Sequence, residues 1–172
     1  MESQLSRSAR AAAERAADLV NVLEGGTVAE VREALRSHGE TDVELSVDDL
    51  AEMRSVAAVL REIFAAGDTG QAAELLNAAL ARAHPPRLTT HGGTFGWHLH
   101  VDSSDDAPWG EWFLTSSCLA LAVLLADRQS PPGGVCSCGK SFVDSGRGSA
   151  RRYCSSRCAT RARVAAHRRR LP

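Results

Sequence analysis

The segment VCSCGKSFVDSGRGSARRYCSSRCATRARVAAHRRR, residues 135–170, decides how the C-terminal end of this chain can fold. It contains four of the five cysteines, and ten of the twenty lysines and arginines, of a 172-residue chain. The cysteines form two close pairs with fifteen residues between them. Two such pairs, brought together by the intervening loop, supply the four soft donors that Zn²⁺ prefers in a tetrahedral site. The sequence therefore predicts one zinc ion bound by Cys136, Cys138, Cys154 and Cys158.

The predicted zinc is structural. Four cysteine ligands leave no open position for water or substrate, which a catalytic zinc requires. A segment of fewer than about 40 residues is also too small to build its own apolar core, and a metal can replace that core. Disulfides and unrelated free thiols are the alternatives. We expect a reducing cytoplasm, because the N-terminus shows no apolar signal segment, and clustered thiols there bind metal more often than they form disulfides.

Charge is divided between the two ends of the chain. Residues 140–172 carry Lys140 and nine arginines against Asp144, whereas residues 1–139 carry ten basic and twenty acidic residues. A helix beginning near Ser156 would place several arginines on one stripe, and we expect its alanine face to pack against the cysteine hairpin. Guanidinium groups match phosphate oxygens, although a solvated surface is the alternative for any charge run. We predict nucleic-acid contacts from Arg147, Arg151, Arg152, Arg157, Arg161, Arg163, Arg168, Arg169 and Arg170.

The remaining sequence predicts a helical body. Apolar residues repeat at helical spacing over about 5–23, and three further helices are expected after the N-caps Thr27, Ser46 and Asp68. Two alternating runs flank His91-Gly92-Gly93 and predict a small β-hairpin near 87–101. The segment 111–128 is apolar nearly all round, which indicates a helix in the centre of the core.

These patterns predict a mainly α (α+β) fold. We expect a helical N-terminal domain over residues 1–129 with one small β-hairpin, a linker over 130–134, and a treble-clef-like zinc finger over 135–172. The linker is assigned to the proline- and glycine-rich end of the segment QSPPGG, which interrupts both helix and strand.

Other thiol and imidazole groups have weaker signals. Cys118 lies among apolar residues of the expected core helix, so we predict a buried, unreactive thiol. His98 and His100 share one face of the second hairpin strand, with His91 at the turn. Such histidines can bind a metal, but no carboxylate or cysteine nearby has suitable spacing, so this site is the less favoured alternative.

The segment from Cys138 onward resembles the CGNR-type zinc finger in its Cys138-Gly139 pair, its Phe142-Val143-Asp144-Ser145 stretch, its Arg151-Arg152-Tyr153-Cys154 stretch, and in Cys158 with Arg161. It departs from that family where Ala159-Thr160 replaces Gly-Asn, and where the first cysteine pair is shortened to Cys-x-Cys. The upstream region is similar to the ABATE domain that accompanies this finger. The resemblance implies a stress-related bacterial transcription regulator with a DNA-binding finger.

We therefore expect a cytoplasmic regulator with DNA as its partner. The acidic body would bind a small-molecule effector or pair with a second copy of the chain. The alternative is a protein-interaction module, whose basic finger docks on an acidic domain. We expect no enzymatic activity, because no acid, base and nucleophile are assembled in a recognised motif. We expect no membrane partner, because the longest apolar run, at 119–126, is too short to span a bilayer.

Overall fold

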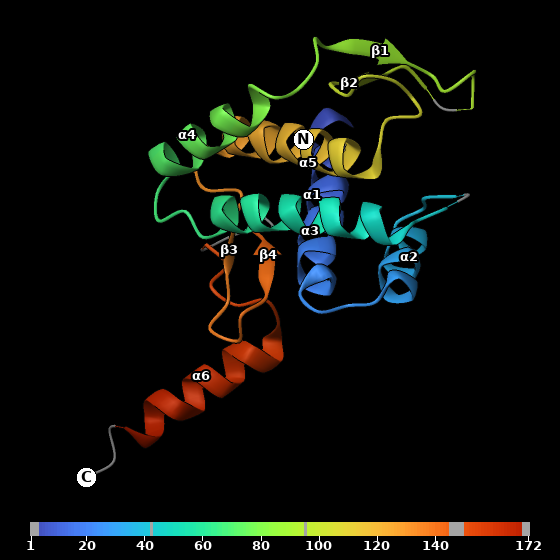
Figure 1. Cartoon of the computed structure of the whole chain (residues 1–172). Coiled ribbons are helices and arrows are strands. Elements are labelled where there is room, and N and C mark those ends of the chain that lie inside the picture. The colour runs from blue at the N-terminus through green and yellow to red at the C-terminus, as the bar shows by residue number, and fades with distance from the viewer. Residues whose placement is uncertain (1–3, 42, 95, 145–149, 170–172) are drawn as a thin grey trace.

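The computed structural model describes residues 4–41, 43–94, 96–144 and 150–169 (Figure 1). Within these residues the chain forms helices and two antiparallel two-stranded sheets. The helices are α1 (Gln4–Leu23), α2 (Val28–Ser37), α3 (Val47–Phe64), α4 (Thr69–Leu80), α5 (Trp109–Arg128) and α6 (Ser156–Arg168). The strands are β1 (Arg87–Thr89), β2 (His98–His100), β3 (Gly133–Val135) and β4 (Ser141–Val143). The predicted fold class, a helical body with one small hairpin and a C-terminal finger, is confirmed.

The helix starts follow from local hydrogen bonding. The Thr27 hydroxyl accepts from the Glu30 amide at 3.3 Å, and the Ser46 hydroxyl accepts from the Asp49 amide at 3.0 Å. Asp68 caps α4 in the same way. Each cap satisfies an amide that the first helical turn leaves without a partner, so these three predicted boundaries are correct.

The core forms where α5 contacts α1, α3 and α4. Figure 1 shows α3 and α5 running in similar directions while α1 crosses both. The side chains at these contacts are almost completely buried and include Leu19, Leu60, Phe64, Phe113, Leu121 and Leu124. Burying one such side chain stabilises the fold by about 1.5–3 kcal/mol, so these contacts hold the body together.

The apolar character of α5 extends beyond the run at 119–126. Among the described residues, α5 is the one helix long and apolar enough to cross a bilayer, with a mean hydropathy of 1.4 over its most apolar window. The central helix of a protein core meets the same criterion, and α5 contacts three other helices. That the chain has no membrane partner stays a prediction.

The finger hairpin β3–β4 packs directly against the body. Val143 is 4% exposed and joins the core cluster, and β4 contacts α1. A Cβ atom on Gly133 would lie 2.1 Å from the carbonyl oxygen of Phe142 and 3.0 Å from Phe64 Cδ1, so only glycine fits there. Residues 133 and 134 of the predicted linker are therefore part of β3. The division into folding domains stays a prediction.

Asn21 of α1 connects the body to the edge of β4. Its side-chain amide donates to the Ser141 carbonyl at 2.9 Å, and its amide oxygen accepts from the Ser141 N–H at 2.8 Å. The asparagine thus satisfies both backbone polar groups of one strand residue, as a neighbouring strand would.

Replacing Asn21 should test this attachment. We expect Asn21→Ala to lower the free energy of unfolding by about 1–3 kcal/mol, because it leaves a partly buried donor and acceptor without partners. The measurement is urea denaturation followed by circular dichroism. The control is Asn77→Ala at an exposed position of α4. Equal losses in the two variants would contradict the role of Asn21.

Candidate metal centre

The first cysteine pair lies in the turn between β3 and β4. The Cys136 amide donates to the Lys140 carbonyl, and the Gly139 amide donates to the Cys136 carbonyl, both at 2.8 Å. Gly139 has a φ of +94°, a left-handed conformation that glycine adopts without strain. This tight turn holds Cys136 and Cys138 close together.

The second cysteine pair lies at the N-terminus of α6. The Ser155 hydroxyl caps the helix by accepting from the Cys158 amide at 3.2 Å. Cys154 therefore immediately precedes the cap, and Cys158 lies in the first turn. The positive end of the helix dipole favours thiolates at such positions.

The structure brings the two pairs together. Cys154 Sγ lies 3.5 Å from Cys138 Sγ and 3.6 Å from Cys158 Sγ. All four sulfur atoms, including that of Cys136, lie within 4.8 Å of one another. Sulfur atoms on one tetrahedral zinc, each about 2.3 Å from the ion, would be about 3.8 Å apart. The four cysteines therefore fit one structural zinc ion, as predicted.

The thiols differ in how readily they ionise. Burial disfavours the Cys136 thiolate, but hydrogen bonds from the backbone amides and the thiols of Cys138 and Cys154 together outweigh burial and lower the pKa of Cys136 to about 6. Burial and hydrogen bonds with the thiols of Cys138 and Cys158 raise the pKa of Cys154 to about 12. Zinc binding must therefore release protons from this cluster.

Cys118 has no part in this centre. It is fully buried in α5, and burial raises the pKa of its thiol to about 12. The prediction that it is a buried thiol is confirmed.

Arg151 connects the two halves of the finger. Its guanidinium donates to the carbonyls of Val143, Tyr153 and Cys154, and it lies 5.3 Å from the centre of the Phe142 ring. Arg151 was predicted to contact nucleic acid, because a charge run does not show which guanidinium groups bond within the finger. In the structure its side chain bonds to the finger itself.

The body also supports the cysteine turn. Arg61 of α3 donates to the Gly139 carbonyl at 2.7 Å and forms a 3.2 Å ion pair with Glu24. The sequence offered no signal for this contact, because 78 residues separate Arg61 from Gly139. The turn that carries the first cysteine pair is therefore bonded to α3 through Arg61, and the strand after it is bonded to α1 through Asn21.

The C-terminal segment is similar to a known protein family. Residues 134–171 match the family model of the CGNR zinc finger. This match identifies the C-terminal segment. It spans all four cysteines and α6, and leaves the helical body outside. No curated protein matches the chain.

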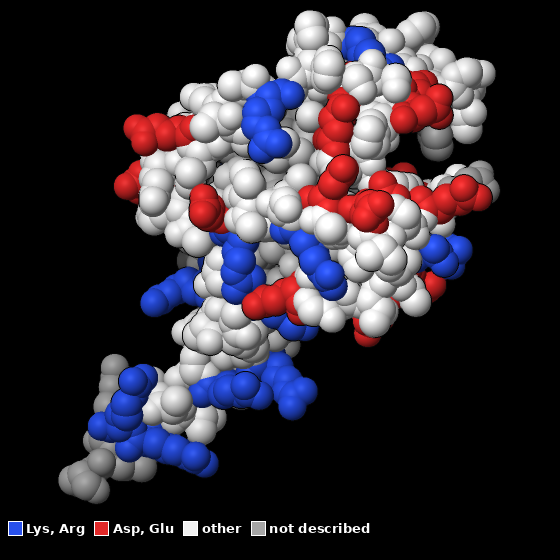
Figure 2. Space-filling view, viewed as in Figure 1, with Lys and Arg blue, Asp and Glu red and all other residues white. Residues whose placement is uncertain are grey.

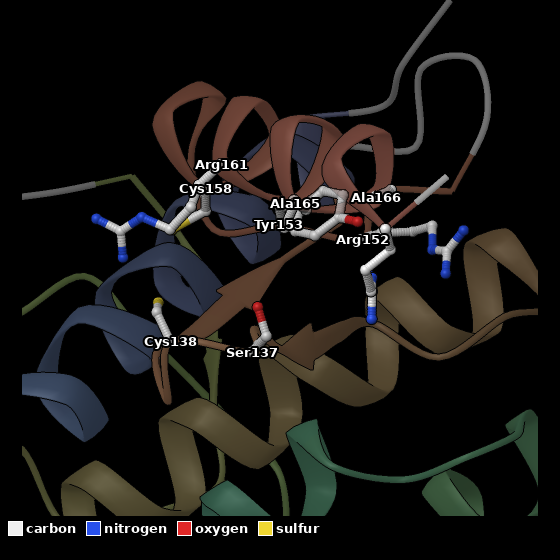
Figure 3. A pocket seen from close by; sticks show the side chains of 10 residues that line it. Ser137, Cys138, Arg152, Tyr153, Cys158, Arg161, Ala165 and Ala166 are labelled. Carbon is white, nitrogen blue, oxygen red and sulfur yellow. The ribbon is translucent and has the colours of Figure 1, made fainter. Parts of the chain in front are cut away.

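The predicted packing of α6 in the CGNR finger is wrong. No residue of α6 is buried, although we expected its alanine face to lie against the hairpin. A hollow of about 590 Å³ separates them (Figure 3). Figure 3 shows Ser137 and Cys138 on the hairpin side of this hollow, and Ala165 and Ala166 on the helix side. Alanine side chains are too short to reach the hairpin across this space.

The arginines of the CGNR finger are mostly exposed. Figure 2 shows lysine and arginine gathered around the finger and acidic residues spread over the body. Arg147 and Arg170 lie outside the described residues. Arg151 is exposed but bonds to carbonyls of the finger, and the other exposed arginines are Arg152, Arg157, Arg161, Arg163, Arg168 and Arg169.

Removing one zinc ligand should remove one metal ion. We expect Cys154→Ser to lose one equivalent of zinc relative to the parent chain, because three thiolates and a hydroxyl bind zinc more weakly. The measurement is elemental analysis after dialysis. Cys118→Ala also removes one thiol but should retain the parent zinc content. A Cys154→Ser chain with full zinc would contradict the assignment.

Arg151 and Arg157 should differ in their effect on metal affinity. We expect Arg151→Ala to weaken zinc binding about 10–100-fold, because its bonds to three carbonyls position the segment that carries Cys154. Arg157→Ala removes the same charge from an exposed site and should change the affinity little. Competition with a zinc chelator measures both. Equal effects would show that charge alone matters.

Proposed function

We propose that this chain is a DNA-binding transcription regulator, in which the CGNR finger presents α6 to duplex DNA. The proposal rests on the six exposed arginines other than Arg151, namely Arg152, Arg157, Arg161, Arg163, Arg168 and Arg169. In the part of the chain that the structure describes, none of them forms an ion pair. Guanidinium groups without carboxylate partners are suited to phosphate oxygens.

The shape of α6 supports this proposal. A helix of 13 residues is about 20 Å long. Including its side chains it is about 10–12 Å in diameter, and the major groove of duplex DNA is about 12 Å wide. Figure 1 shows α6 extending away from the body, so that the body does not cover it. Most of its arginines would contact phosphates, and only those that reach base edges would read sequence.

The hollow beside α6 extends the basic surface. Arg152, Arg161 and Arg169 line it, together with Tyr153. A second hollow of about 560 Å³ is lined by Arg161, Arg168 and Arg169 around Val164 and Ala165. The proposed contact surface therefore includes the helix and the segment before Cys154.

The remaining roles belong to the same proposal. The chain would act in the cytoplasm, without enzymatic activity and without a membrane partner. Its acidic body would bind a small-molecule effector or pair with a second copy. The finger's zinc would organise structure only, because its four cysteines complete the coordination shell.

Salt dependence provides the test. Four to six phosphate contacts give a slope of log affinity against log salt of about −4 to −5. The Arg157→Ala, Arg161→Ala double variant should bind more weakly and flatten the slope by about 2. Fluorescence anisotropy with duplex DNA measures both. Arg36→Ala with Arg82→Ala removes equal charge from exposed sites on the body and should leave the slope unchanged. Identical slopes in both double variants would contradict the proposal.

Charge separation favours one second candidate, a protein-interaction module. The acidic surface of the body and the basic finger in Figure 2 have opposite charges of similar size. The finger would then dock on the acidic body of another chain. If duplex DNA of any sequence fails to bind at low salt while the chain self-associates in a salt-sensitive manner, this candidate replaces the first.

A further inference from the structure

The β1–β2 hairpin presents three histidines to one another. It lies in the upper part of Figure 1, at the opposite end of the molecule from α6. His98 and His100 occupy alternate positions of β2, and therefore point to the same face. His91, in the turn, has a φ of +47°. The three ring centroids are 4.8–5.0 Å apart, so the rings form a nearly regular triangle.

The inner nitrogen atoms have the spacing of metal ligands. Nε2 of His91 lies 3.0 Å from Nε2 of His98, and the three histidines offer ligand atoms within 4.8 Å of one another. Imidazole nitrogens bound about 2.0–2.1 Å from one tetrahedral ion would be about 3.3 Å apart, with ring centroids about 5 Å apart. The 3.0 Å between Nε2 of His91 and Nε2 of His98 is slightly below the first value, and the centroid distances of 4.8–5.0 Å agree with the second.

Each outer nitrogen has an acceptor. Nδ1 of His91 lies 3.1 Å from Asp105, Nδ1 of His98 lies 2.7 Å from the Gly96 carbonyl, and Nδ1 of His100 lies 2.8 Å from Asp102. These acceptors place the proton of each ring on Nδ1, so the Nε2 lone pairs face the shared centre. The repulsion between converging lone pairs is relieved either by a proton shared between two of these nitrogens or by a cation bound to all three. Metal-binding histidines commonly have this arrangement of outer partners.

A further network fixes the carboxylates. Arg87 donates to Asp102 and to Asp105, each at 2.6 Å, while the second oxygen of each carboxylate faces a histidine. The Asp102 side chain is 3% exposed. Two carboxylates and one guanidinium leave one negative charge around the cluster, which favours a bound cation. The sequence did not predict Asp102 and Asp105 as partners of the histidines, because both lie in the loop after β2, whose path cannot be derived from residue spacing.

We propose that His91, His98 and His100 form a second metal site, which binds a divalent transition metal ion of the zinc class. Imidazole ligands suit zinc, cobalt, nickel and copper, whereas magnesium and calcium prefer oxygen. Three protein ligands leave a fourth position for water or a small ligand. An isolated two-stranded hairpin is marginally stable in water, so the ion would also stabilise β1–β2. This site is independent of the DNA proposal.

Cobalt titration of the full chain, loaded with one equivalent of zinc that occupies the finger alone, tests the site. We expect one further equivalent of cobalt to bind, with visible bands but without the thiolate-to-cobalt charge-transfer band that displacement of the finger zinc would produce. His98→Gln should weaken this binding at least about 100-fold while the finger keeps its zinc, which reports that the chain is folded. His167→Ala, at an exposed position of α6, is the matched control and should bind cobalt as the parent does.

Asp102→Asn tests the outer partners. Asp102 positions His100 and does not itself bind the ion. We therefore expect Asp102→Asn to weaken cobalt binding about 10–100-fold, whereas the visible spectrum, which reports the ligand atoms, should stay unchanged. If no further equivalent binds to the parent chain, the histidines form a hydrogen-bonded cluster only and the proposal is wrong. Binding that persists unchanged in His98→Gln would also overturn it.

Discussion

The attachment of α6 depends on the four thiols of the finger. The helix buries none of its own residues, so apolar packing does not hold it to the body. Its N-terminus is fixed at the cysteine cluster, where Cys154 Sγ lies 3.5 Å from Cys138 Sγ and 3.6 Å from Cys158 Sγ. Binding of zinc by all four cysteines replaces the core that such a short segment lacks. The direction in which the arginines of α6 point is therefore set by metal coordination.

The other end of this connection is the helical body. The hairpin that carries Cys136 and Cys138 is bonded to α1 through Asn21 and to α3 through Arg61, and Val143 enters the main core. The apolar core thus fixes the position of the hairpin, the hairpin fixes the first cysteine pair, and the cysteine cluster fixes the direction of α6. A change in the body that shifts α1 or α3 would move the finger hairpin with it. The effector binding that we propose for the body would therefore have a physical route to the finger.

Local signals predicted most of the fold. The caps Thr27, Ser46 and Asp68 depend on neighbours three residues away, and the cysteine spacing is nearly sufficient by itself to define the metal centre. The contacts that sequence did not predict are non-local or depend on orientation. Asn21 pairs with Ser141 across 120 residues. The sequence does not show that Arg151, unlike its neighbouring arginines, bonds to three carbonyls of the finger. The small alanines of α6 indicated packing that the structure lacks.

Both two-stranded hairpins are stabilised by interactions outside their own strand pairing. Each has strands of three residues and cannot be stable through strand pairing alone. The finger hairpin gains contacts to the body and a four-thiol cluster, whereas Leu88 and Leu99 of the β1–β2 hairpin are 64% and 40% exposed. That hairpin instead relies on Arg87, which bridges two carboxylates that in turn hold two imidazoles. Polar networks and ligand clusters therefore provide order where these short segments bury little apolar surface.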